Sequence, residues 1–220
     1  MMISPEAYYD SELQGKTPEQ IRRKIKSLRR EITALKRTME NPDYTPLCCP
    51  SEDVRISCDR LYLERAKKAL ADMGVEYSPN LNERRAMAFD AAIEDIQEIR
   101  LEIGGFLSTW HTYTVYLEDP VRFEFLDTML CPPIAEGPKE GYGLVRKLDF
   151  CNGFSTLHMG EWRKIYTCDR YGICIEDGTQ WRVVITYRDG RKPFECSGSN
   201  AFPYNFKHFC CIIRAFGEPC

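Results

Sequence analysis

The segment from Thr17 to Met39 repeats apolar residues at alternating intervals of four and three positions. This spacing puts the apolar side chains on one face of an α-helix and is typical of a coiled-coil seam. At its start, Thr17 can cap the helix, Pro18 suits the first helical position and Gln20 can complete a capping box. The pattern predicts a helix over about 17–41. Its seam, which needs a helical partner, consists of Ile21, Ile25, Leu28, Ile32, Leu35 and Met39.

Two partners for this seam are conceivable. β-Branched residues alternating with leucine suit a parallel homodimer, but basic residues flank the seam and would repel a second copy. The segment 82–103, with Asn80 or Asn82 as its cap, has a helical apolar line and many acids, so we expect it to form a helix and to pair within the chain. Its apolar line is Ala86, Phe89, Ile93, Ile96 and Ile103, and its acids are Asp90, Glu94, Asp95, Glu98 and Glu102.

A further helix is expected over 56–73, ending at Gly74. Its apolar face would comprise Leu61, Tyr62, Ala66, Leu70 and Met73. A proline-rich loop, 41–53, separates it from the first helix. We therefore predict an N-terminal bundle of three helices whose first hairpin is coiled-coil-like.

The pattern changes after Gly104-Gly105 to aromatic and β-branched residues, which predicts strands at about 106–117 and 121–126. The stretch 131–143 has the proline and glycine density of a linker. This organisation predicts a helical bundle with a β-hairpin over 1–130 and a small α+β module over 144–220. The module to which the hairpin belongs stays open.

Asp-Gly pairs in "EDGTQ" and "RDGRK" are strong turn signals, because both residue types tolerate positive φ. After a short helix within 144–157, we expect an antiparallel meander with strands at about 163–168, 171–176, 180–188 and 192–197. In the third strand, Trp181, Val183, Ile185 and Tyr187 would face the core. A closing helix with Phe206, Phe209 or Cys210, Ile213 and Phe216 would cover that face. The predicted fold class is α+β.

Three stretches of this module, "LHMGEWRKIY", "DGTQWRVVITYRDGRKP" and "GSNAFPYNF", resemble hypothetical proteins carried by integrative and conjugative elements of anaerobic gut bacteria. The N-terminal "GKTPEQIRRKIKSLRREI" and "YLERAKKAL" are similar to the same family. The resemblance implies a genomic setting and no catalytic residues. Such elements carry conjugation machinery, regulators and small proteins that blunt host defence nucleases, anti-CRISPR proteins among them, which favours an interaction protein.

Composition limits the alternatives. A net charge of −3 gives no global basic field, so a nucleic-acid site would have to be local. The 11 cysteines include no C-x-x-C pair, which favours free thiols over a disulfide framework or a zinc site. The absence of a signal-like or 18-residue apolar segment predicts a cytoplasmic protein with no membrane partner. No metal site or cofactor is predicted.

The candidate binding residues fall into two groups. The first helix carries a basic set that would either contact phosphates or a protein partner, or form a solvated face that pairs with the acidic helix. It comprises Arg22, Arg23, Lys26, Arg29, Arg30, Lys36 and Arg37. Asn200, expected to cap the last helix, could form with Tyr204 and Asn205 a polar-aromatic patch for a partner.

No arrangement in the sequence predicts catalytic residues. His158 and His208 could each approach a cysteine, and Cys210 follows His208 closely, but no flanking signature accompanies them. We therefore expect a non-enzymatic protein-binding module of a mobile element, an inhibitor of a host defence nuclease being one such function. The alternatives are a nucleic-acid-binding protein that uses the first helix, and an enzyme whose site the sequence does not reveal.

Overall fold

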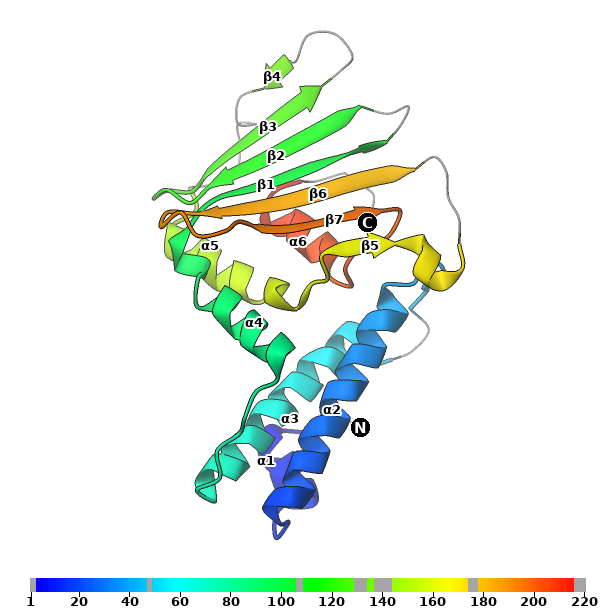
Figure 1. The fold of residues 1–220 in the computed structure, drawn as a ribbon, viewed down its shortest axis with the longest axis vertical. Helices are drawn as coiled ribbons and strands as arrows, with labels where there is room; N and C mark the ends of the chain where they lie inside the picture. The colour runs from blue at the N-terminus through cyan, green and yellow to red at the C-terminus, as the bar shows by residue number, and fades with distance from the viewer. Residues whose placement is uncertain are drawn as a thin grey trace. The chain divides into compact units, whose positions relative to one another are not determined.

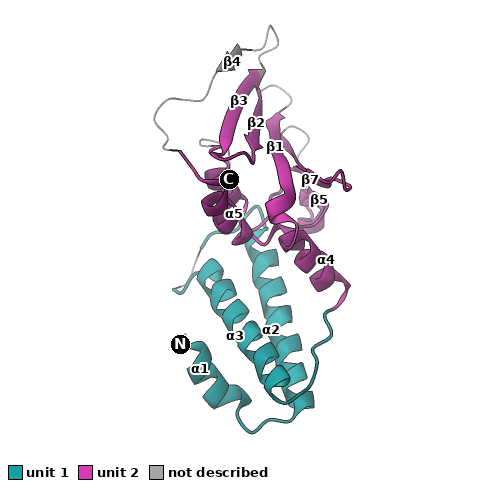
Figure 2. Ribbon diagram, turned by 90° about the vertical axis from the view of Figure 1, so that its left-hand side faces the viewer, with its two compact units in different colours: residues 1–79 teal, residues 80–220 magenta. Residues whose placement is uncertain are grey.

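The computed structural model of the chain describes residues 3–46, 49–105, 109–128, 144–173 and 178–215, together with the backbone of 134–136. The chain divides into two compact units, unit 1 spanning Met1–Pro79 and unit 2 spanning Asn80–Cys220 (Figure 2). This division differs from the expected one, which placed the boundary within 131–143. We describe each unit by itself.

Unit 1 is built on two long helices, α2 (Pro18–Met39) and α3 (Glu52–Asp72), which pack along each other. The predicted capping box is present at the start of α2, since the Thr17 hydroxyl accepts from the Gln20 amide and the Gln20 side chain accepts from the Thr17 amide. The seam is buried as predicted, with Met39 only half-buried at its end. The buried seam residues are Ile21, Ile25, Leu28, Ile32 and Leu35.

The seam of α2 packs on a line of α3 that the sequence predicted only in part. Tyr62, Ala66 and Leu70 are buried, whereas Leu61 and Met73 are exposed. The last two were assigned to the apolar face in error, because Leu61 is adjacent to Tyr62 in sequence and so points to a different side of the helix, and Met73 is the C-cap beyond the last helical residue. Gly74 ends the helix with φ +70°, as expected of a left-handed stop.

A short N-terminal segment packs on α3. It comprises α1 (Pro5–Tyr8) and a π-helical turn, η1 (Tyr9–Leu13). Tyr8 stacks on Tyr62 with ring centroids 4.3 Å apart, and Leu13 is buried in the same cluster. Unit 1 therefore buries its apolar residues between elements that are close in sequence.

Unit 2 begins with α4 (Leu81–Asp90), which Asn80 and Glu83 start with a second capping box. The expected helix over 82–103 is wrong beyond Asp90. A 3₁₀ turn, η2 (Ile93–Asp95), leads into strand β1 (Ile96–Gly105). Ile99, Leu101 and Ile103 alternate with polar residues, which is the period of a strand. The neighbouring strands β2 (Trp110–Tyr116) and β6 (Thr179–Tyr187) form backbone hydrogen bonds with the two edges of β1.

The sheet of unit 2 has the strand order β4-β3-β2-β1-β6-β7-β5 (Figure 1). Neighbours are antiparallel except β5 and β7, which are parallel. The remaining strands are β2 (Trp110–Tyr116), β3 (Arg122–Thr128), β4 (Ile134–Glu136), β5 (Ile165–Thr167), β6 (Thr179–Tyr187) and β7 (Phe194–Ser199). Because β1 pairs with β6, the hairpin left open by the sequence belongs to this sheet.

Three further expectations are corrected by this topology. The stretch 131–143 is not wholly a linker, since β4 pairs with β3, although 131–133 and 137–143 lie outside the described residues. The module is not a simple meander, because β5 joins the sheet edge in parallel. The strand expected at 171–176 is absent from its described part, where η4 (Cys168–Tyr171) leads to Gly172 at φ +72°, while 174–177 lie outside the description.

Helices cover one face of the sheet (Figure 1). They include α5 (Lys147–Ser155), within the predicted 144–157, and α6 (Phe206–Ile212), with the turn η3 (Met159–Glu161) nearby. The predicted inward face of β6 is confirmed, because Trp181, Val183, Ile185 and Tyr187 are all buried. Phe206, Phe209, Cys210 and Ile213 are buried against it, as expected, and Phe216 lies outside the described residues. The fold class is α+β, as predicted.

Candidate nucleic-acid interface

Four basic side chains stand together on the solvent face of α2. Arg22, Arg23, Lys26 and Arg30 are all exposed. Lys26 lies four positions after Arg22, three after Arg23 and four before Arg30, so it neighbours each of them on the helix surface. We call these four residues the cationic ladder. It spans about 12 Å of helix axis at about 1.5 Å per residue.

The other three basic residues of the predicted set are engaged differently. Arg29 is half-buried and its Nη1 donates to the Tyr77 hydroxyl over 3.3 Å, within unit 1. Lys36 is half-buried and Arg37 exposed, and both make polar or electrostatic contacts. The predicted set therefore separates into the ladder and three residues that already make polar or electrostatic contacts.

The acidic helix expected to neutralise these residues does not exist. Its second half forms β1, and the helix that covers the α2 seam is α3. The acids of α2 are used elsewhere: Glu31 pairs with Arg55 of α3 at 3.1 Å, and the Glu19 carboxyl accepts hydrogen bonds from its own amide and the Thr17 hydroxyl. Among described residues, the four ladder side chains show no ion pair or hydrogen bond, and the charges of Arg22 and Arg23 contribute to lowering the pKa of the Glu19 carboxyl.

Like charges at these spacings destabilise a helix by about 0.2–0.5 kcal/mol for each pair. The ladder contains three such pairs, centred on Lys26. The repulsion is small compared with the buried seam, so the helix forms despite it. A polyanion bound along the ladder would remove this repulsion, which makes the ladder the strongest candidate for an interface.

The second predicted patch proves to be part of an internal joint. Asn205 is half-buried, its Oδ1 accepts from Trp162 Nε1 at 3.0 Å, and its Nδ2 donates to the Leu157 carbonyl at 2.7 Å. Asn200 does not cap α6 as expected, because Asn205 occupies that position. It instead adopts φ +53° at the end of β7, half-buried, while Tyr204 is half-buried and makes a contact of its own.

The segments 178–181 ("GTQW") and 200–206 ("NAFPYNF") lie next to each other beside this joint. Trp181 Nε1 donates to the Ala201 carbonyl at 2.9 Å, and the Asn200 amide donates to the Thr179 carbonyl at 2.9 Å. A Cβ on Gly178 would lie 1.8 Å from Asn200 Oδ1, so no other residue fits there without displacing Asn200. "GTQW" and "NAFPYNF" are thus held together by hydrogen bonds and close packing and form one structural element.

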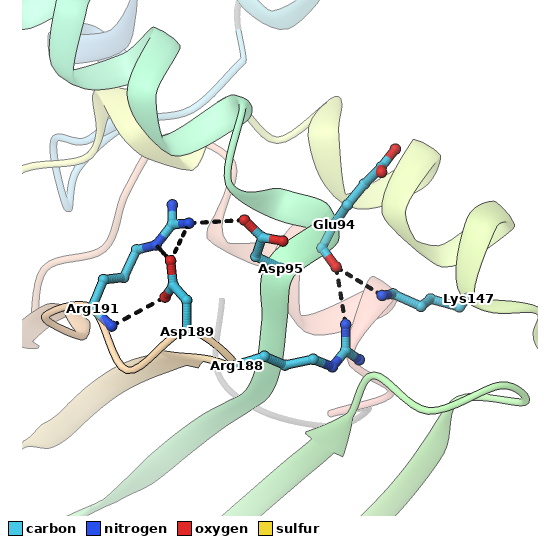
Figure 3. A network of polar contacts seen from close by, with 6 residues as sticks. All are labelled: Glu94, Asp95, Lys147, Arg188, Asp189 and Arg191. Atoms are coloured by element: carbon cyan, nitrogen blue, oxygen red, sulfur yellow. Dashed lines mark hydrogen bonds and ion pairs between the residues drawn. The ribbon is translucent and has the colours of Figure 1, made fainter.

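A polar network joins the β6–β7 turn to η2 and α5 (Figure 3). Lys147 Nζ and Arg188 Nη1 both donate to the Glu94 carbonyl, at 2.7 and 3.1 Å. Arg191 donates to Asp189 at 2.6 Å and to Asp95 at 2.8 Å, and its hydrogen bonds lower the pKa of the Asp189 carboxyl. These cations hold segments together and, unlike the ladder, already have acceptors.

Nucleophilic chemistry finds little support among the described side chains. Burial raises the pKa of the thiols of Cys151, Cys168 and Cys196, which keeps them protonated near neutral pH and therefore unreactive. Cys168 also donates to the Asn200 carbonyl at 2.8 Å. His208 is exposed on α6 while Cys210 is buried, so the two do not share an environment.

Three other features depend on the described residues: a metal site, disulfides and membrane-spanning helices. The described part of the chain has no cluster of three or more histidine, cysteine, aspartate or glutamate side chains suited to a metal ion. The cysteines placed in the structure are free thiols: Cys49, Cys58, Cys151, Cys168, Cys196, Cys210 and Cys211. Within the described ranges no helix has both the length and the apolar character needed to cross a bilayer.

One polar residue in unit 1 was missed by the sequence analysis. Asp59 of α3 is buried at 9% exposure, in line with Ile56 and Tyr62 on the face that contacts α2. An acid that interrupts an apolar helical line was the signal that could have identified it.

Comparison of the chain with family models, curated proteins and solved structures found no match.

Proposed function

We propose that the protein is a non-enzymatic binding protein whose cationic ladder on α2 binds the phosphate backbone of a nucleic acid. The observation that carries the proposal is the set of four adjacent, exposed cations, which make no ion pair or hydrogen bond with a described residue, although the charge of Glu19 acts on Arg22 and Arg23. A DNA duplex presents one negative charge for about every 1.7 Å of its axis, so about seven phosphate charges lie opposite a ladder of this length. Arginine supplies three of the four cations and can bind phosphate oxygens in a bidentate manner.

Binding through this helix is expected to be independent of base sequence. The α2 sequence contains no aromatic residue on which a base could stack. Contacts to phosphates fix the position of a protein on nucleic acid and carry no sequence information. The proposal therefore predicts similar affinity for duplexes of unrelated sequence.

The proposal gives the earlier hypotheses a common setting. The raised thiol pKa values support a role without nucleophilic catalysis. A cytoplasmic nucleic-acid-binding protein would suit a mobile element, where both conjugation and defence nucleases act on nucleic acid. An inhibitor of such a nuclease would use the same ladder on an acidic protein surface, and the experiment below separates the two.

The test is a fluorescence-anisotropy titration of the full chain with a labelled 20-base-pair duplex of arbitrary sequence at low salt. The ladder variant carries Arg22→Gln, Arg23→Gln, Lys26→Gln and Arg30→Gln. The control carries Lys68→Gln, Arg84→Gln, Arg85→Gln and Lys192→Gln, four exposed cations outside the ladder, so that both variants lose the same charge. We expect the ladder variant to lose about tenfold or more in affinity and the control to change by less than about threefold.

Equal losses in the two variants would show that net charge, not the ladder, governs binding. Absence of binding by the unaltered chain would refute the proposal. A pull-down from host lysate, with and without nuclease, provides the second arm. A protein partner that survives nuclease and is lost with the ladder variant would favour the inhibitor hypothesis over nucleic-acid binding.

A further inference from the structure

The inference concerns Asp59, the buried carboxyl of unit 1. Its side chain lies on the α3 face that packs on α2, and its exposed fraction is 9%. Its Oδ2 atom is fully buried and has no hydrogen-bond partner among the described residues. A buried ionised carboxylate without partners is costly, so the folded unit disfavours the charged form.

The groups that face Asp59 come from three elements. From the N-terminal segment comes Tyr8, whose hydroxyl has a pKa raised to about 12. Burial is the main cause, and the charges of Glu12 and then Asp59 add to it, which places Tyr8 near the Asp59 carboxyl. From α2, Glu31 repels the Asp59 charge, and from α3, Arg55 attracts it. Because Arg55 is already paired with Glu31 at 3.1 Å, its attraction is shared.

The N-terminal segment is the element that can move to hydrate Asp59. We call Ile3–Leu13 the clasp. It is held on α3 by the stack of Tyr8 on Tyr62 and by the Tyr62 hydroxyl, which accepts from the Ile3 amide at 3.0 Å and donates to the Ile3 carbonyl at 2.8 Å. Tyr62 lies three positions after Asp59, so the anchor of the clasp and the buried carboxyl are neighbours on one helical face.

We propose that Asp59 is a pH-sensitive latch, whose ionisation releases the clasp from α3 while the α2–α3 hairpin stays folded. The hairpin is retained because α2 and α3 pack along each other, and the seam residues Ile32 and Leu35 are buried outside the cluster to which the clasp belongs. Opening the clasp removes Tyr8 from the carboxyl and admits water. The released state exposes Tyr62, which the clasp otherwise covers.

The direction of the pH effect follows from the folded-state pKa. Burial, and then the charge of Glu31, raise the pKa of Asp59 above its ordinary value to about 6, and Arg55 opposes this. The closed clasp therefore binds a proton more tightly than the open one. Closure is fully favoured below the ordinary aspartate value of 3.8, weakens as the pH rises from there to about 6, and changes little above that. A difference of about two pKa units changes the opening equilibrium by at most about 100-fold.

The test is hydrogen exchange of the full chain, read by mass spectrometry at pH 5 and pH 8 and corrected for the intrinsic exchange rate. We expect peptides of the clasp to lose about tenfold or more in protection at pH 8, while α2 and α3 peptides keep theirs. Asp59→Asn, an uncharged variant of the same shape, should abolish the pH dependence. Asp72→Asn, an exposed acid on the same helix, should preserve it.

A second variant makes the outcome specific to Asp59. Glu31→Gln removes the repelling charge and frees Arg55 to attract the carboxyl. Both changes lower the pKa of Asp59 in the closed clasp, so the midpoint of clasp opening should move to lower pH. Clasp protection that does not depend on pH, or a dependence that survives Asp59→Asn, would overturn the proposal. A midpoint unmoved by Glu31→Gln would overturn it as well.

Discussion

Unit 1 and unit 2 solve the same problem, burial of an apolar core, with contacts of different range. Unit 1 packs α2 on α3, which follow each other in the chain, and its seam repeats with the period of a helix. Unit 2 pairs β1 with β6, which are separated in the chain by four strands and α5, and encloses its core between the sheet and helices from both ends of the unit. Local periodicity therefore specifies the first unit, and long-range pairing specifies the second.

The two units also differ in how they treat positive charge. In unit 2, Lys147, Arg188 and Arg191 donate to carbonyl or carboxylate oxygens that tie distant segments together. In unit 1, the four ladder cations are exposed and make no ion pair or hydrogen bond with a described residue. The ladder cations are therefore better candidates for binding a partner than the cations of unit 2, which already have acceptors.

The largest effect is expected from Trp181→Ala in unit 2. Trp181 is 2% exposed, donates to the Ala201 carbonyl and contacts the rings of Phe202 and Phe206. Its truncation should lower the free energy of unfolding by about 4 kcal/mol. The measurement is denaturant unfolding combined with hydrogen exchange, which reports on each unit separately.

Trp110→Ala is the control, because Trp110 is 41% exposed. Its cost should be below about 2 kcal/mol, since less of its surface is removed from solvent. Loss of protection confined to unit 2 in Trp181→Ala would sharpen the comparison. Equal loss in α2 and α3 would break it, since the units would then unfold together.

The next effect is expected from Leu70→Ala in unit 1. Leu70 is fully buried in the cluster that joins α2, α3 and the clasp. The change should cost about 3 kcal/mol of unfolding free energy and reduce exchange protection in α2 and α3. Leu61→Ala, on the same helix but 55% exposed, should cost less than about 1 kcal/mol. A similar cost for both would mean that the seam does not stabilise the unit.

A smaller effect is expected from Asn205→Ala. The substitution removes the acceptor of Trp162 Nε1 and the donor to the Leu157 carbonyl, both within unit 2. Leaving these groups without a partner should cost about 1–3 kcal/mol in chemical unfolding. Lys207→Ala, an exposed neighbour, is the control and should stay within about 0.5 kcal/mol. An unchanged stability for Asn205→Ala would contradict the internal role and return this residue to the candidate surface patch.

The sequence predicted the elements that depend on local rules. The capping box at Thr17, the heptad seam of α2 and the inward face of β6 follow from spacing alone, and the structure confirms them. It failed at β1, because Ile93, Ile96 and Ile103 also fit a helical period. Only pairing with β2 and β6 decides for a strand, and sequence patterns do not report such distant partners.

The candidate site was predictable in its members and not in its surroundings. All four ladder residues were identified from the sequence. The acidic helix that was expected to pair with them was wrong, because the last part of its segment, 82–103, forms β1. The role of Asn205 in the interior could not be foreseen, since it depends on Trp162 and Leu157, which the fold brings together from afar. Asp59 was overlooked because one acid in an apolar line is easily assigned to a solvated face.

The salt dependence of duplex binding tests the central claim most directly. Neutralising four phosphates releases their counterions, so the logarithm of the association constant should fall with the logarithm of salt concentration with a slope of about −3.6. The four-residue ladder variant should bring that slope close to zero, and the control variant should leave it unchanged. A slope that stays the same after removal of Arg22, Arg23, Lys26 and Arg30 would contradict the assignment of the ladder as the nucleic-acid interface.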